Sequence, residues 1–63
     1  MNYPEKIKEI RDVLLLSQEE LAEELSVSFA TVNRWENGHH EPTIKAKRAI
    51  RGYCKKKKIK WDN

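Results

Sequence analysis

The 63-residue sequence has little that would stabilise a small protein covalently or through a metal. It contains one cysteine, Cys54, so an internal disulfide is excluded, which suits a reducing compartment. The adjacent His39 and His40 have no third histidine and no nearby cysteine, so we predict no metal site and no cofactor. No histidine and acid pair flanks Cys54 as catalysis would require, so we predict that the chain is not an enzyme and has no small-molecule substrate.

Long apolar segments are also missing. No apolar run approaches the ~18 residues of a membrane-spanning helix, and Lys6, Glu9 and Arg11 interrupt any signal-peptide core. We therefore expect a cytoplasmic protein with no membrane partner. A single domain of this length buries only about 60% of its unfolded surface, so stability must come from apolar helix faces or from a partner chain.

Acidic side chains are scarce in the second part of the chain. Residues 1–28 carry three basic and seven acidic side chains, a net charge of −4, whereas residues 29–63 carry ten basic and three acidic, a net charge of +7. A basic half on an otherwise balanced chain is typical of a protein with a polyanionic partner, although lysine runs are also common at solvated chain ends.

The N-terminal half predicts two helices. One begins near Pro4, which suits a first helical turn, and ends near Leu15. The next begins at Ser17, which can form a capping box with Glu20. Their expected inward residues are Ile7, Ile10, Leu14, Leu21, Ala22 and Leu25, with Val13 beside the first face.

Two further helices are predicted after residue 28. Ser28 is a suitable N-cap for one that ends at Gly38, and Thr43 is a suitable N-cap for the other. Val32 and Trp35 should face inward from the helix that Ser28 caps. The inner stripe expected after Thr43 consists of Ala46, Ala49, Ile50, Tyr53 and Cys54. Residues 1–54 are then one helix-turn-helix domain, and residues 55–63 are a basic C-terminal tail that frays.

The tight corner "LSVS", residues 25–28, joins the two central helices as in a helix-turn-helix unit. Val27 can fill the corner, and the small Ala22 permits close approach of the helices. The outer face of the helix after Ser28 is then free to enter a DNA major groove.

Residues 16–42 resemble the Cro/repressor type of helix-turn-helix protein. The matching positions are Gln18, Leu21, Ala22, Leu25, Val27, Ser28, Thr31, Val32, the segment "RWENG" at 34–38, and Pro42. The resemblance implies an all-α fold, a small lambda repressor-like bundle of four to five helices with the helix-turn-helix at its second and third helices. It also implies binding of double-stranded DNA, with a possible homodimer on a two-fold operator.

The resemblance suggests which residues touch DNA. Gln18 would bond a phosphate, and Arg34 is the best candidate for a base contact because arginine pairs bidentately with guanine. Phe29 would either touch a thymine methyl or fold back on the inner face. Arg11 and Glu36 match a pair that forms an inner salt bridge in the family. The expected DNA-binding residues are Gln18, Ser28, Phe29, Ala30, Thr31, Asn33, Arg34 and Asn37.

Three features depart from the family pattern. Leu15 and Ser26 stand at two corners where glycine is usual, and each would need a left-handed backbone. The chain offers lysines where the family commonly adds a fifth, dimerising helix. The run Lys55–Lys58 with Lys60 either follows the DNA backbone or only solubilises the chain, and Trp61 is a weaker candidate for stacking on nucleic acid.

Sequence-specific DNA binding in transcriptional control, in the manner of a repressor, is the function that these residues favour. An antitoxin or a restriction-modification controller would use the same DNA chemistry. A protein-interaction module that has lost DNA binding is the competing class. Such a module should show an apolar patch on the outer face, where this sequence has polar side chains at Thr31, Asn33, Arg34 and Asn37.

Overall fold

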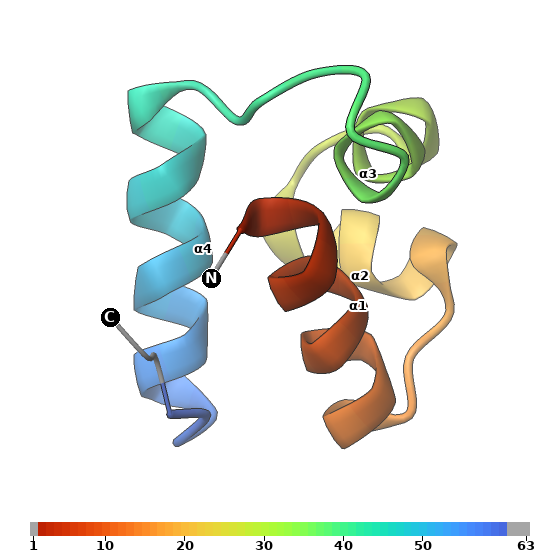
Figure 1. Cartoon of the computed structure of the whole chain (residues 1–63). Helices are drawn as coiled ribbons and strands as arrows, with labels where there is room; N and C mark the ends of the chain where they lie inside the picture. The colour runs from red at the N-terminus through yellow and green to blue at the C-terminus, as the bar shows by residue number, and fades with distance from the viewer. Residues whose placement is uncertain (1, 61–63) are drawn as a thin grey trace.

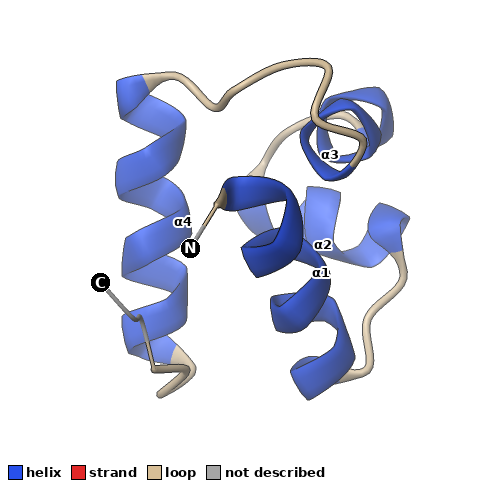
Figure 2. Cartoon of the chain, in the orientation of Figure 1, coloured by secondary structure: helices blue, strands red, loops and turns tan. Residues whose placement is uncertain are grey.

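The computed structural model describes residues 2–60, which form four helices and no strand within that range. These helices are α1 (Tyr3–Leu14), α2 (Gln18–Leu25), α3 (Phe29–Glu36) and α4 (Ile44–Lys56) (Figures 1 and 2). The all-α fold of four to five helices expected from the sequence is confirmed for these residues. In Figure 1, α4 lies at one edge of the molecule, α3 lies toward the opposite edge, and α1 lies between them in that view. None of the helices in the described range is both long and apolar enough to cross a bilayer.

Each helix begins at a polar cap. The capping box of α2 is confirmed, because the Ser17 hydroxyl accepts the Glu20 N–H at 3.0 Å and the Glu20 carboxylate accepts the Ser17 N–H at 2.9 Å. Ser28 caps α3 and Thr43 caps α4, as predicted. Helix α1 begins one residue before the predicted Pro4, because the Asn2 side chain caps it.

The core is assembled from all four helices. Its buried apolar residues are Ile7, Ile10, Leu21, Ala22, Val32, Trp35, Ile50, Tyr53, Cys54 and Ile59. Two sequence expectations were wrong here: Ala49 is exposed rather than part of the inner stripe of α4, and Val13 is 58% exposed. The inward side of α4 is centred on Ile50 and Tyr53, and a step of about 100° per residue turns Ala49 away from it.

The segment after residue 54 differs from the expected fraying tail. Helix α4 continues to Lys56, and a left-handed Lys58 (φ 61°) turns the chain so that the Ile59 N–H donates to the Cys54 carbonyl at 2.8 Å. Ile59 is 9% exposed, and the buried Lys6 ammonium of α1 donates to the Lys60 carbonyl. An apolar side chain and one buried donor therefore hold residues 57–60 against the bundle. Trp61 and the rest of the predicted tail lie outside the described residues.

Two corners place a non-glycine residue in the left-handed region, as the departures from the family pattern predicted. Leu15 after α1 has φ 57°, and Ser26 after α2 has φ 60°. Each lies at the C-cap of its helix, and its backbone N–H donates to carbonyls of the last turn. An L-residue in this conformation costs about 1–2 kcal/mol, so both corners hold local strain that the packed helices sustain.

We expect Leu15→Gly to raise the free energy of unfolding by about 0.5–1 kcal/mol, because glycine adopts the left-handed backbone without strain. The greater conformational entropy of glycine in the unfolded chain offsets part of this stabilisation. The Leu15 side chain is 88% exposed, so little packing is lost. Urea denaturation measures the change. The matched control is Val13→Gly inside α1, where glycine should lower the free energy of unfolding by roughly 0.5 kcal/mol because its helix propensity is lower than that of valine. Equal destabilisation by both changes would contradict the strain at Leu15.

Candidate nucleic-acid interface

The corner between α2 and α3 sets the direction of α3. After the left-handed Ser26, the Val27 N–H donates to the Ala22 carbonyl at 2.9 Å, and the half-buried Val27 packs against the core. Ala22 is only 3% exposed, in accord with its predicted role at a close approach of the two helices. This arrangement is the helix-turn-helix unit that the sequence predicted.

Helix α3 has one buried and one exposed side. Val32, Trp35 and Glu36 are buried against the other helices. Ala30, Arg34 and Asn37 are exposed on the other side, as the helical wheel predicted. Helix α3 can therefore present its exposed side to a DNA groove without disturbing the core. That side carries polar side chains and one cation rather than an apolar patch.

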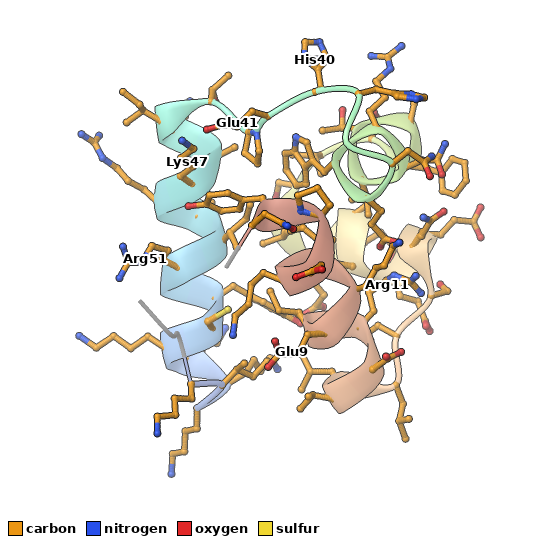
Figure 3. All side chains as sticks on the ribbon, viewed as in Figure 1. Glu9, Arg11, His40, Glu41, Lys47 and Arg51 are labelled. Atoms are coloured by element: carbon orange, nitrogen blue, oxygen red, sulfur yellow. The ribbon has the colours of Figure 1, made fainter. Side chains whose placement is uncertain are left out.

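The buried side of α3 is tied to α1 by an ion pair. The Arg11 guanidinium donates to both Glu36 carboxylate oxygens, with Nε–Oε2 at 2.5 Å and Nη2–Oε1 at 2.9 Å. Figure 3 shows Arg11 on the side of α1 that faces away from α4. The Glu36 side chain is only 4% exposed, whereas that of Arg11 is 24% exposed. The inner salt bridge implied by the family resemblance is therefore present.

Glu36 is ionised in this setting. Burial acts to raise the pKa of Glu36, but hydrogen bonds from Arg11 and Gln18 outweigh burial and lower it below its usual value. The pKa of Arg11 is raised, chiefly by its hydrogen bond to Glu36 and against the opposing effect of burial. A charged and doubly bonded carboxylate thus fixes the end of α3 relative to α1.

Gln18 and Asn33 join this network, which the sequence did not reveal. The Gln18 amide Nε2 donates to Glu36 Oε1 at 3.1 Å and to Asn33 Oδ1 at 3.4 Å. Asn33 Oδ1 also accepts from Asn37 Nδ2 at 3.3 Å. The i, i+4 spacing of Asn33 and Asn37 is the one sequence signal that could have predicted part of it. Gln18 therefore joins the start of α2 to α3 through Glu36 and Asn33.

The first turn of α3 carries the remaining predicted residues. The Ser28 hydroxyl accepts the Thr31 N–H at 3.1 Å and lies 2.9 Å from the Thr31 hydroxyl. Phe29 is 50% exposed and outside the core, so of the two alternatives for this residue the inner-face position does not occur. Its ring lines a shallow hollow of about 710 Å³ against α2, together with Ser17, Glu19, Glu20, Ala22, Glu23 and Val27.

The loop after α3 continues from the C-terminal end of that helix. Gly38 has φ 74° and ends the helix as predicted, and the His39 N–H donates to the Arg34 carbonyl at 3.0 Å. His40 points outward from the loop (Figure 3). Within residues 2–60, no three histidine, cysteine or acidic side chains are grouped so as to hold a metal ion.

Comparisons with known proteins agree with this geometry. A family model described as "Helix-turn-helix" matches residues 7–58. Over 50 residues the chain is 36% identical to the HTH-type transcriptional activator BcrR of Enterococcus faecalis. That alignment covers 79% of this chain and 24% of BcrR, so the chain spans about a quarter of the length of this relative. The search of solved structures gave no significant match. The chain therefore belongs to the Cro/repressor-type helix-turn-helix family of DNA-binding transcription regulators.

Proposed function

We propose that the chain binds duplex DNA sequence-specifically through the outer face of α3. The observation that carries this proposal is the division of α3: Trp35 and Glu36 anchor one side, and Arg34 is exposed on the other. An anchored helix presents its exposed side chains in one fixed orientation, which a hydrogen-bonded base contact requires.

Each predicted residue has a chemical role in this proposal. Arg34 donates to guanine, Ala30 and the half-exposed Phe29 touch thymine methyl groups, and Asn33 and Asn37 lie at the edge of the groove. Ser28 and Thr31 offer hydroxyls to the flanking backbone. The second hydrogen of the Gln18 amide, held only by a 3.4 Å contact with Asn33, is available to a phosphate oxygen.

We further propose that the domain represses transcription by occupying DNA, as a homodimer on a two-fold site. A small domain blocks a promoter by excluding polymerase from the site, which needs no contact beyond the DNA itself. The similar protein BcrR is named as an activator, and activation requires a further surface for the transcription machinery. Repression is proposed because it requires only the DNA contact that we propose for α3.

Selection from a pool of random duplexes tests the proposal. We expect an enriched motif made of two half-sites, with centres one helical turn or a multiple of it apart. The control is Ala30→Glu, which places a carboxylate on the exposed face of α3 and should abolish enrichment without unfolding the protein. A promoter fusion carrying the enriched motif should then be repressed in cells. Absence of any enriched motif would overturn sequence-specific binding.

A further inference from the structure

Helix α4 and the turn after it carry a high density of positive charge. Residues 42–60 contain nine lysine or arginine residues and no acidic residue. Like charges one turn apart on a helix repel each other, and an exposed face that mixes both signs avoids this repulsion. Residues 42–60 bring these like charges close together, and the DNA contacts proposed for α3 do not use them.

The charges lie on the outward side of α4. Ile50 and Cys54 are buried, while Lys45, Arg48 and Lys55 are exposed on the side opposite to them. Arg48 and Lys55 are seven residues apart, roughly 10 Å along the helix axis. Figure 3 shows Arg51 directed away from α1 as well. The outward basic face of α4 is defined here as Lys45, Arg48, Arg51 and Lys55.

A hollow lies between the C-terminal part of α4 and the turn that follows it, next to this face. It has a volume of about 400 Å³ and is lined by Arg51, Gly52, Cys54, Lys55 and Ile59. Gly52 is exposed, and a Cβ built there would meet nothing within 4 Å. The absence of a side chain at Gly52 leaves an opening between the two cations Arg51 and Lys55, where a phosphate group can approach the helix.

Local contacts explain only some of the cations. Lys47 pairs with Glu41, Lys57 lies 5.7 Å from the centre of the Tyr53 ring, and lysines in the last turn suit the negative end of the helix dipole. Lys45 and Arg48 are near the start and middle of α4, where the dipole gives no such benefit. Within residues 2–60, no ion pair includes Lys45, Arg48 or Lys55.

The outward face of α4 is directed away from α3. The two helices lie toward opposite edges of the molecule in Figure 1, and the inward side of α4 packs on the shared core. A duplex seated on the exposed side of α3 therefore lies away from Arg48 and Lys55. These cations can therefore meet a different stretch of polyanion.

DNA suits this face better than a membrane surface. A helix that lies on a bilayer needs a free apolar side to insert below the headgroups. The apolar side of α4 is used in the core, and its outward face offers Ala49 and Gly52 between the cations, with Ile44 exposed only at the N-terminal end. Cations without apolar anchors bind phosphates sequence-independently.

We propose that the outward basic face of α4 is a second, sequence-independent DNA-binding site, which holds a separate stretch of duplex while α3 occupies its own site. The bridging role rests on the function proposed for α3, whereas the binding of duplex by α4 does not. The domain would then bring two segments of DNA together.

A two-duplex capture experiment tests this. A biotinylated duplex that carries the selected motif is immobilised, protein is added, and capture of a fluorescent random-sequence duplex is measured. The test variant is Lys45→Gln/Arg48→Gln/Lys55→Gln, which alters exposed side chains only. The matched control is Lys45→Arg/Arg48→Lys/Lys55→Arg, which keeps every charge. Circular dichroism confirms that both variants are folded.

We expect wild type and the charge-retaining control to capture the second duplex, and the glutamine variant to lose capture while its affinity for the selected duplex changes little. For binding of random duplex alone, its log–log salt slope should be shallower by about 0.9 for each lost phosphate contact. If selection yields no motif, this slope is measured with random duplex only, and a shallower slope still supports the α4 site although α3 has failed.

Three results would overturn the α4 site. Capture and salt slope of the glutamine variant could equal those of wild type. Capture could be abolished by Ala30→Glu on α3 yet be unaffected by the glutamine changes, which would mean that two α3 helices of a dimer hold the two duplexes. The glutamine changes could instead abolish binding to vesicles containing phosphatidylserine and leave duplex capture intact, which would assign the face to lipid.

Discussion

Replacing Glu36 with alanine is expected to remove most of the domain's stability at 25 °C. Loss of one partner of a buried ion pair costs about 3–5 kcal/mol, because the other charge remains without compensation. The Arg11 side chain is 24% exposed and can reach water, so we expect a value near 3 kcal/mol. A core of this size supplies about 3–5 kcal/mol in total, so such a loss removes most of the stability. Thermal and urea denaturation followed by circular dichroism measure it.

The ion pair of Glu41 and Lys47, between the loop and α4, offers a matched control. Glu41 pairs with Lys47, but the Glu41 side chain is 70% exposed. Glu41→Ala should therefore leave the melting temperature unchanged within error. The melting temperature of Glu36→Gln should lie between those of Glu36→Ala and Glu41→Ala, because glutamine removes the charge and keeps a hydrogen-bonding group of the same shape. Equal melting temperatures for Glu36→Ala and Glu41→Ala would show that the buried pair does not hold α3 on α1.

The same pair gives the wild-type protein a defined response to acid. The pKa of Glu36 is lowered on folding, so the unfolded state takes up its proton first as the pH falls. The stability due to the ionised carboxylate is complete above its unfolded pKa, near 4.5, and is lost as the pH falls through the lower folded value. Glu36→Gln should lack this part of the pH dependence of unfolding.

Arg34→Ala is expected to weaken binding to the best DNA site by about 1–3 kcal/mol and to relax preference at one base position. Its side chain is exposed opposite the buried Val32 and Trp35, so the fold should be unaffected. Binding to a panel of single-base changes in the selected site, at one salt concentration, measures the effect. Lys8→Ala, an exposed cation of α1, is the control for loss of charge alone.

Gln18→Ala should behave differently from Arg34→Ala. A phosphate contact carries no base information, so the loss should be similar across the whole panel. Because Gln18 also donates to Glu36, its variant should be somewhat less stable, and binding is compared at a temperature where it is fully folded. A uniform loss for Arg34→Ala would make Arg34 a phosphate contact. No loss for either variant would favour the interaction-module alternative.

The sequence by itself determined the helices and the buried side of each central helix. Caps such as Ser17, Ser28 and Thr43 act through hydrogen bonds to residues three positions away, so their partners can be found in the sequence. The apolar spacing that places Val32 and Trp35 inward is equally local. The pair Arg11–Glu36, 25 residues apart, was available only through the family resemblance.

Only the tertiary structure decided which polar groups meet across the bundle. The sequence supported Gln18 and Asn33 as separate DNA contacts, and the fold joins them to Glu36 in one network. The sequence likewise did not indicate that Lys6 would be buried and bonded to the Lys60 carbonyl, 54 residues away. Nor did it indicate that Ile59 would be part of the core. Local patterns show which side of a helix is apolar, but contacts between distant residues depend on how the packed helices are oriented and where the chain turns back. That geometry places the α4 cations on a face of their own.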